Sequence, residues 1–350
     1  LPVKKETILK PMYPYRFSII VPTFNRLDEI RELLESLEKQ TLGKDAFEVL
    51  VVDDGSTDDT AAYVAEKLKQ GRLNLRFLSQ DHQGPGPARN LGMENAQGEY
   101  YLFIDSDCIA HEGWLKAYHA ALTEKVAGFG GPDRVREDFS PLQKAIDYSM
   151  TSFLTTGGIR GSSKKKISKY YPRSFNMGVH ADVVKKIGGF GSLRHGQDIE
   201  FTHRVRKEGK VIKVMDAVVY HKRRTSLKRF FKQVYNWGVA RINLYKIDKG
   251  MLEFIHFFPF VATVFVFAFL IALCLWPAYL WPFAFAALAL LILMALHGVV
   301  KYKDIRVLPY IPLVVPIQIL GYGLGFGGAL IRRVIFGGKE TTGFVKHYYQ

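Results

Sequence analysis

The sequence predicts an α/β domain built on a mostly parallel sheet, followed by a small α-helical membrane region. Up to about residue 250, short apolar runs alternate with segments whose apolar residues recur at helical spacing. From residue 254 to residue 335 the chain is almost wholly apolar, and its few charges gather at 301–306 and at Arg332 and Arg333. We therefore expect a boundary near residue 250 between a soluble domain and a membrane region.

Strands and helices alternate along the predicted soluble domain. Apolar runs predict strands at residues 17–21, 47–52, 75–79, 100–104 and 211–220. Helical spacing predicts helices at residues 30–37, 58–70, 87–96 and 199–208. This alternation implies right-handed crossovers and a sheet with helices on both faces, in which ligands bind beyond the carboxyl ends of the strands.

Two charge-free apolar runs follow the soluble domain. Residues 257–276 are long enough to span a bilayer, and residues 280–296 are slightly short for a span. Trp276, Tyr279 and Trp281 lie at the tight connection, where amphipathic rings suit a membrane interface. We expect a transmembrane hairpin, with a buried helical core as the alternative.

A third apolar stretch, residues 308–331, contains prolines and several glycines that we expect to break or kink a helix. Basic residues flank it on both sides, and positive charge favours the cytoplasmic side of a membrane. A third transmembrane helix and a re-entrant or interfacial segment therefore both remain open.

The formal net charge is +15, and the basic residues concentrate at 164–169, at 221–232 and beside the apolar runs. Beside membrane spans such a surface favours anionic lipid headgroups over nucleic acid. The two cysteines, Cys108 and Cys274, imply no disulfide framework and fit a reducing compartment. With no signal peptide apparent, we expect a multi-pass protein of the cell membrane whose soluble domain is cytoplasmic.

Two carboxylates, Asp105 and Asp107, follow the predicted strand at 100–104. At this spacing they oppose each other's ionisation unless a cation offsets the repulsion, and oxygen-rich sites suit Mg²⁺ or Mn²⁺. A loop with solvated aspartates is the alternative. Neither the dinucleotide glycine fingerprint nor the phosphate-loop lysine motif is present, which counts against dehydrogenases and P-loop enzymes.

Four motifs occur in order at residues 19–26, 51–58, 84–92 and 103–107. In sequence they read IIVPTFNR, VVDDGSTD, GPGPARNLG and FIDSD. Their order and spacing resemble family 2 glycosyltransferases, which have the GT-A fold, a Rossmann-like mostly parallel sheet. The resemblance covers about residues 16–246.

The resemblance implies a nucleotide-sugar site and a metal site with Mn²⁺ or Mg²⁺. Asp53 or Asp54 would accept a hydrogen bond from the nucleotide base. Arg89 would donate hydrogen bonds to the base or the diphosphate. Asp105 would contact the ribose or the metal's hydration shell, and Asp107 would ligate the metal. The predicted nucleotide-sugar residues are Pro22, Thr23, Asn25, Arg26, Asp53, Asp54, Arg89, Asp105 and Ser106. The predicted metal ligands are Asp107, Asp105 and His221.

Residues 174–178 and 188–190 resemble the family's acceptor side, and residues 196–200 occupy the place of its usual Glu-Asp pair. We assign the general base to Asp198, which also suits the N-cap of the following helix. Gln197 replaces the expected acid. For Asp198 the alternative is a helix cap without a catalytic role. For Asp53 and Asp54 the alternative is a turn, and for Arg89 it is a position on the surface of a helix.

Residues 226–250 predict an amphipathic helix lying on the bilayer or packed beneath the soluble domain. Within it, residues 233–237 are similar to the Gln-x-x-Arg-Trp signature of processive family members, but Asn236 replaces the arginine. This weakens the processive interpretation. Residues 157–169 predict a mobile loop that either orders over a ligand or is an inert linker.

The sequence therefore predicts an inverting, metal-dependent glycosyltransferase on the cytoplasmic membrane face. It would move a sugar from a UDP- or GDP-linked donor to a lipid-linked or polysaccharide acceptor, with membrane lipids as further partners and no nucleic acid. Its predicted regions are a catalytic domain at 1–225, an interfacial helix at 226–250 and a membrane region at 251–350. The alternatives are a non-catalytic membrane scaffold and a haloacid-dehalogenase-type phosphatase with Asp105 as nucleophile.

Overall fold

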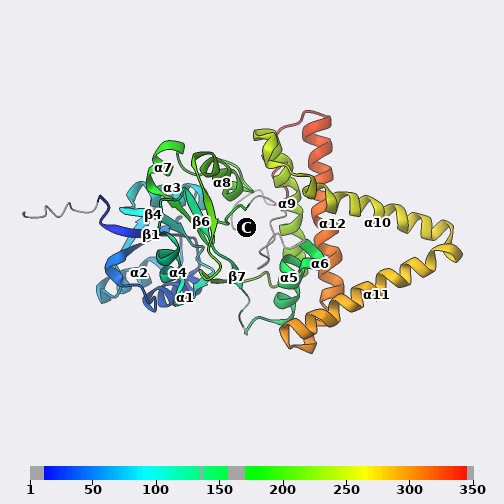
Figure 1. Ribbon diagram of the computed structural model, residues 1–350, viewed down its shortest axis with the longest axis horizontal. Coiled ribbons are helices and arrows are strands. Elements are labelled where there is room, and N and C mark those ends of the chain that lie inside the picture. The colour runs from blue at the N-terminus through cyan, green and yellow to red at the C-terminus, as the bar shows by residue number, and fades with distance from the viewer. Residues whose placement is uncertain (1–11, 135, 137, 157–169, 345–350) are drawn as a thin grey trace, which may run out of the picture.

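The computed structural model describes residues 12–134, 136, 138–156 and 170–344. It contains a domain built around a sheet and a helical region that lies on one side of that domain (Figure 1). The predicted loop at 157–169 lies outside the described residues. The α/β prediction with a following helical region is confirmed.

The main sheet has seven strands in the order β3-β2-β1-β4-β8-β6-β9. Strands β1 to β4 run parallel, and β8 is antiparallel to both of its neighbours, β4 and β6. The sheet is thus mostly parallel, as predicted. Its strands are β1 (Tyr15–Thr23), β2 (Phe47–Asp53), β3 (Leu75–Ser79), β4 (Gly98–Phe103), β6 (Gly128–Gly130), β8 (Met177–His180) and β9 (Val211–Lys213).

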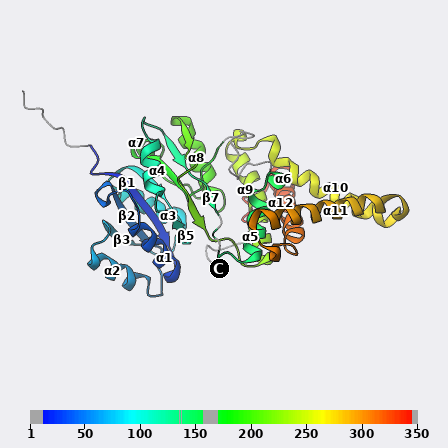
Figure 2. The ribbon, with the colours of Figure 1, turned by 60° about the horizontal axis from the view of Figure 1, so that its bottom comes forward.

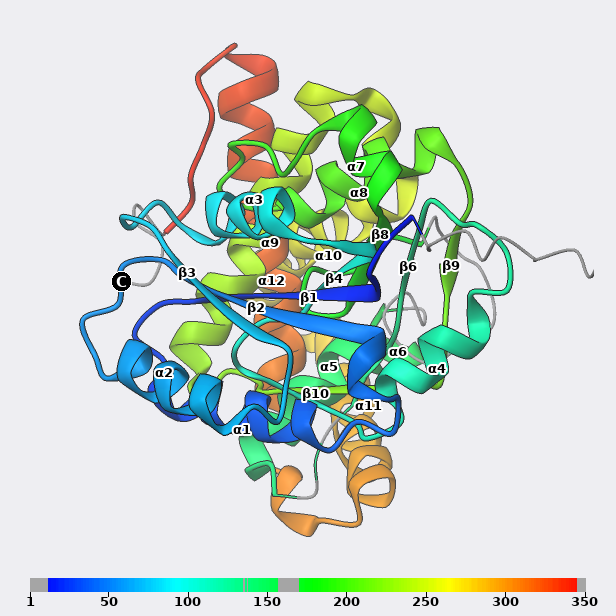
Figure 3. The same cartoon turned by 90° about the vertical axis from the view of Figure 1, so that its left-hand side faces the viewer.

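Helices cover both faces of this sheet because each central strand is apolar on both sides (Figure 3). Alternate residues of β1 show the division: Ile19 packs in the core under α1, α2 and α4, whereas Ile20 packs in the core under α3, α7 and α8. The first group is α1 (Leu27–Glu38), α2 (Thr60–Gln70) and α4 (Trp114–Ala121). The second is α3 (Pro85–Asn95), α7 (Ala181–Ile187) and α8 (Gln197–Glu208).

A second sheet of three strands corrects the prediction of one strand over residues 211–220. Its order is β5-β10-β7, and the strands are β5 (Cys108–Ala110), β7 (Asp133–Arg134) and β10 (Val219–His221). The chain leaves the main sheet after β9 and turns before β10, with Val219 N bonded to Pro132 O. His221 therefore ends β10, opposite Cys108 of β5.

The helical region consists of a layer next to the sheet domain and a hairpin that projects away from it (Figure 1). In the layer, α9 packs along α12, and α5 packs beside both (Figure 2). The hairpin is formed by α10 and α11, which run crosswise to α9 and α12. The bounds are α5 (Pro141–Thr151), α6 (Phe153–Thr156), α9 (Leu227–Ile247), α10 (Phe258–Leu275), α11 (Pro277–Tyr302) and α12 (Ile311–Ala329).

The expectation that prolines and glycines break the third apolar stretch is wrong. α12 continues through Pro316 as one helix, and a π-helical segment, Leu330–Ile335, follows it. Its glycines permit close contact: a Cβ on Gly325 would clash with Tyr235 O of α9, and one on Gly323 would clash with the Thr263 side chain of α10. Small residues at such crossings allow helix backbones to approach in membranes.

Three helical segments are long and apolar enough to cross a membrane, as judged by length and composition. They are Phe254–Leu275, Pro277–Tyr302 and Ile311–Ile335. The first two are almost unburied, with 6% and 17% of their apolar windows inside the protein, whereas the third is 44% buried. The prediction of apolar helices in the C-terminal region is confirmed, and the alternative of a buried core fails for the hairpin.

Candidate functional site

The ends of β1 and β2 are joined by backbone and side-chain bonds. Asp54 N donates to Thr23 O at 2.9 Å. Asn25, at a φ of 50°, accepts at Oδ1 from Thr57 N at 2.7 Å, so the two loops form one edge. Pro22 is buried in the β1–β2 pair, and Thr23 Oγ1 is buried without a hydrogen-bond partner in the described structure.

Asp53 is the last residue of β2 and Asp54 follows it; both are buried, but their carboxylates have different partners. Asp54 accepts from Gln80 Nε2 at 2.7 Å and from Gly84 N at 2.7 Å, and it thereby holds the loop before α3. Asp53 accepts at Oδ2 from Ser56 N, while its buried Oδ1 has no partner among the described residues. Of the two, Asp53 thus keeps an acceptor oxygen for a ligand.

Arg89 of α3 reaches the end of β4. Its Nη2 donates to Asp105 Oδ1 at 2.6 Å, and its guanidinium lies 5.4 Å from the centre of the Phe190 ring. Arg89 is almost fully buried, which does not fit the helix-surface alternative. The next residue after Asp105, Ser106, is also buried.

Asp107 lies between basic side chains from two distant segments. Arg26 Nη1 donates to Asp107 Oδ2 at 3.2 Å, and His221 Nε2 lies 3.3 Å from Asp107 Oδ1. Burial alone would raise the pKa of Asp107, but His221, Arg26 and Arg224 lower it well below its usual range. Asp107 is therefore a carboxylate at neutral pH.

The possible ligand atoms of Asp107, Cys108 and His221 all lie within 4.8 Å of one another. Burial, with Asp107 and Asp105 nearby, raises the pKa of the Cys108 thiol well above its usual range, so this thiol stays protonated and is a poor ligand. His221 Nδ1 is buried and has no hydrogen-bond partner in the described structure. A carboxylate oxygen suits both Mn²⁺ and Mg²⁺, whereas an added imidazole nitrogen favours Mn²⁺ over the oxygen-preferring Mg²⁺, so this pair fits Mn²⁺ better.

Asp105, the other predicted ligand, is not part of this cluster in the described structure, because its carboxylate pairs with Arg89. Cys108 belongs to the cluster and was not predicted, although it directly follows Asp107 in the sequence. Five of the predicted site residues thus fall into two groups: Arg89 with Asp105, and Arg26 and His221 with Asp107.

Asp198 lies in the first turn of α8, not at its N-cap, which is Gly196. Asp198 Oδ2 lies 3.3 Å from Arg173 Nη1, and Asp198 Oδ1 accepts from Ile199 N. Gln197 packs on Gly86 at the start of α3. The contact is so close that a Cβ on Gly86 would lie 2.7 Å from Gln197 Nε2. The predicted base therefore lies beside the helix that carries Arg89.

Two asparagines, Asn176 of the predicted acceptor side and Asn236 of the signature-like segment, have structural partners. Asn176 is buried, and its Oδ1 accepts from Trp114 Nε1 at 2.8 Å and from Tyr118 OH at 2.6 Å. Asn236, which replaces the signature arginine, accepts at Oδ1 from Phe344 N at 3.1 Å. The amide in this position thus holds the segment that follows α12.

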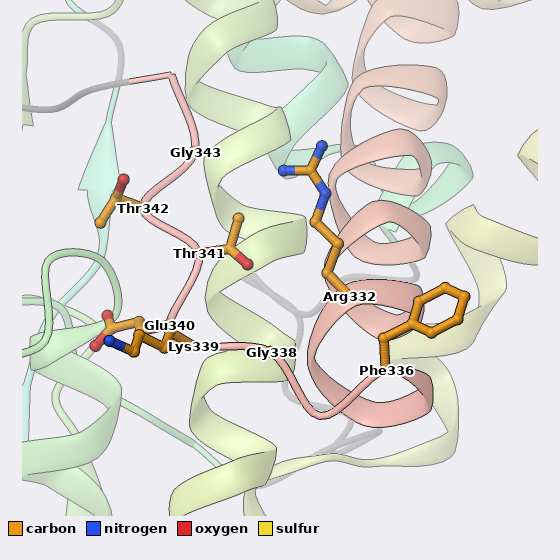
Figure 4. A pocket seen from close by; sticks show the side chains of 8 residues that line it. All are labelled: Arg332, Phe336, Gly338, Lys339, Glu340, Thr341, Thr342 and Gly343. Atoms are coloured by element: carbon orange, nitrogen blue, oxygen red, sulfur yellow. The ribbon is translucent and has the colours of Figure 1, made fainter.

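That C-terminal segment, residues 337–344, lies along α9 and reaches the loop before Asp198. Thr342 O is 3.1 Å from His195 Nε2, and Asn243 Nδ2 donates to Thr341 O. It also borders a hollow of about 470 Å³, whose lining includes Arg332 and Phe336 at the end of the π-helical segment (Figure 4). The residues that line this hollow include no member of the Asp105 group or the Asp107 group.

A buried arginine connects the end of β10, which carries His221, to the helical layer. Arg223, two residues after His221, lies 2.6 Å from Asp133 Oδ2 and 2.7 Å from Asp147 Oδ1 of α5. Tyr302 at the end of α11 donates to the other oxygen of Asp147. Burial alone would lower the pKa of Arg223, but the two carboxylates raise it, so the guanidinium stays charged. Sequence reasoning missed this cluster, since its members are far apart in the chain.

Replacing Arg223 by methionine is expected to lower the free energy of unfolding by about 3–5 kcal/mol, because two buried carboxylates lose their counter-ion. The measurement is thermal unfolding of the detergent-solubilised protein. Arg306→Met is the matched control: Arg306 also pairs with an aspartate but is exposed, so its loss should leave the melting temperature nearly unchanged. Equal effects of the two substitutions would contradict the role given to Arg223.

About half of the chain matches a known protein family. Residues 18–188 match the family model described as "Glycosyl transferase family 2". A dolichyl N-acetyl-alpha-D-glucosaminyl phosphate 3-beta-D-2,3-diacetamido-2,3-dideoxy-beta-D-glucuronosyltransferase of Methanococcus voltae is 27% identical over 264 residues, which cover 69% of this chain and 77% of the relative.

Two further similarities differ in extent. The poly(ribitol-phosphate) beta-N-acetylglucosaminyltransferase TarS of Staphylococcus aureus is 43% identical over 151 residues, 39% of this chain and 26% of that protein. The mannosyltransferase PcManGT of Pyrobaculum calidifontis, solved with GDP-Man and Mn²⁺, superposes with a TM-score of 0.60 at 19% identity, covering 89% of this chain and 88% of the other. The latter similarity shows a shared fold.

Proposed function

Because residues 18–188 match the model of the family 2 glycosyltransferases, we propose that this chain is an inverting, metal-dependent enzyme that moves a sugar from a nucleotide diphosphate to a lipid-linked or polysaccharide acceptor. The observation that carries the proposal is the Asp107 group: a half-buried carboxylate faces His221 and Arg26 beyond the carboxyl ends of the parallel strands. In open α/β sheets this edge is where nucleotides bind.

We assign the donor site to the edge formed by β1, β2 and β4. Asp53 would accept a hydrogen bond from the base through its unpartnered Oδ1, while Asp54 would hold the adjoining loop. Arg89 would hold Asp105 in place and donate to the ribose or diphosphate. Asp107 and His221 would hold Mn²⁺ or Mg²⁺, which as a bound Lewis acid would stabilise negative charge on the leaving diphosphate.

We assign the general base to Asp198. Its carboxylate would take the proton from the acceptor hydroxyl as the oxygen attacks the anomeric carbon. Attack from the face opposite the leaving group gives inversion. The contact of Gln197 with Gly86 supports this assignment, because it holds the first turn of α8 against the helix that carries Arg89.

We place the reaction at the cytoplasmic face of a membrane, with a catalytic domain at 1–225, a helix at 226–250 on the bilayer surface and a membrane region at 251–350. The almost unburied hairpin of α10 and α11 supports this placement. The names of two relatives, one with a dolichyl-linked sugar phosphate and one with poly(ribitol-phosphate), support a lipid-linked or polymeric acceptor.

The proposal predicts that a nucleotide sugar stabilises the protein in a metal-dependent manner. A ligand that binds only the folded state at a hundred times its Kd adds about 2.7 kcal/mol of stability. We expect a UDP- or GDP-linked sugar with Mn²⁺ to raise the melting temperature, and the same sugar with EDTA to raise it less. A panel of such sugars in which none shifts the transition, with or without Mn²⁺, would refute the donor site.

A further inference from the structure

Arg26 lies between two carboxylates. Its Nη1 donates to Asp107 Oδ2 at 3.2 Å and lies 3.7 Å from Glu29 Oε1. Arg26 directly precedes α1, and Glu29 belongs to the first turn of that helix, whereas Asp107 follows β4. All three side chains are partly exposed, with 17% to 30% of their surface accessible. The guanidinium of Arg26 is thus shared by a candidate metal ligand and an acid of α1.

The carboxylates predicted to hold the metal are already balanced by arginines. Arg26 contacts one oxygen of Asp107, and His221 Nε2 lies 3.3 Å from the other. The second predicted carboxylate ligand, Asp105, pairs with Arg89 at 2.6 Å. Like charges a few ångströms apart repel each other. A divalent cation at Asp107 and the guanidinium of Arg26 on the same carboxylate therefore oppose each other.

We propose that Arg26 competes with the metal for Asp107, and that Glu29 takes over Arg26 when the metal binds. The exchange needs only a turn of the Arg26 side chain, because Nη1 already lies 3.7 Å from Glu29 Oε1. Arg26 then has a carboxylate beside it in both arrangements. This inference rests on the proposed function, of which the metal site is a part, and it gives Arg26 and Glu29 control over the affinity for the metal.

The next turn of α1 also places an acid beside the candidate metal site. Glu32, three residues after Glu29, accepts at Oε1 from Lys222 Nζ at 3.0 Å. Lys222 directly follows the predicted ligand His221. Two acids one turn apart on α1 therefore both lie beside basic side chains of this site, one at Arg26 and one at Lys222. This face of α1 supplies the carboxylate that the exchange requires.

The test measures manganese binding without nucleotide and without turnover. Mn²⁺ is titrated into the full detergent-solubilised chain, and the free ion is followed by its electron paramagnetic resonance signal. We expect Arg26→Met to raise the affinity for Mn²⁺ at least about fivefold, because the competing charge is gone. Glu29→Gln should lower the affinity about twofold to fivefold, because Arg26 then stays on Asp107.

The double substitution shows whether Glu29 acts through Arg26. If it does, Glu29→Gln should change the manganese affinity little in the Arg26→Met background, so that the two effects are not additive. Asp28→Asn and Arg31→Met are the matched controls. The first removes an exposed carboxylate next to Glu29, and the second removes an exposed guanidinium of the same helix. Both should leave the affinity nearly unchanged.

Unchanged manganese affinity in Arg26→Met, or an equal effect of Glu29→Gln in both backgrounds, overturns the exchange. If thermal unfolding shows that Arg26→Met does not fold, Glu29→Gln alone decides: a lower affinity supports the exchange and an unchanged one overturns it. Nucleotide-sugar binding is measured in parallel. If it depends on Mn²⁺ while wild type and Arg26→Met bind the free ion equally, the exchange fails and the proposed function stands. If no form binds Mn²⁺, with or without the sugar, both fail.

Discussion

Replacing Asp198 by asparagine is expected to lower kcat by about 10²–10⁴-fold while leaving nucleotide-sugar binding intact. The amide has nearly the same shape as the carboxylate but cannot accept a proton from the attacking hydroxyl, and general-base catalysis contributes a factor of this size. The measurement is the rate of sugar transfer alongside the affinity for the nucleotide sugar, determined by calorimetry. A lower transfer rate with unchanged nucleotide-sugar affinity indicates the loss of the base, whereas a lower affinity indicates the loss of the binding site.

Glu200→Gln is the matched control for Asp198→Asn. Glu200 lies in the same turn of α8, but it pairs with Arg204 and does not contact Arg173. We expect it to retain most of kcat. If Asp198→Asn retained full activity, Asp198 would not be the base, and the alternative of a scaffold that only keeps the nucleotide fold would gain support.

The second large effect is expected from Asp107→Asn. Removing the charge leaves the imidazole of His221 without a carboxylate beside it, and this loss of a ligand should weaken Mn²⁺ binding by at least about tenfold to hundredfold. Manganese affinity follows from titration calorimetry or from the electron paramagnetic resonance signal of free Mn²⁺. Nucleotide-sugar binding should then lose its dependence on the metal.

Asp45→Asn is a control for this substitution, because Asp45 is an exposed carboxylate in the short 3₁₀ turn before β2. It should leave manganese affinity unchanged. Unaltered manganese affinity in Asp107→Asn would show that the ion, if bound, is held elsewhere.

The sequence was most informative where the structure depends on local pattern. Apolar runs located β1 to β4 within one or two residues, and the carboxylates that follow β2 and β4 could be assigned to one edge because parallel strands share an orientation. The ordered motifs then specified the family. These features need no knowledge of which distant segments come together.

The wrong predictions concerned features that depend on tertiary contacts. Residues 211–220 read as one strand, because the apolar pattern does not show that the chain passes from one sheet to another. The glycines of α12 read as helix breakers, although they serve close contact with α9 and α10. Likewise Asn236 and Arg223 acquire their partners from segments far away in the chain, so no local signal could identify them.

The link from Asp133 through Arg223 and Asp147 to Tyr302 also bears on which acceptors can react. Moving the end of β10 relative to the hairpin would break a buried ion pair, which costs about 3–5 kcal/mol. The distance from Asp107 to the hairpin is therefore set by the fold. If the hairpin enters a membrane as proposed, this fixed distance selects acceptors. An acceptor then reacts only when its hydroxyl lies at the matching distance from the bilayer surface.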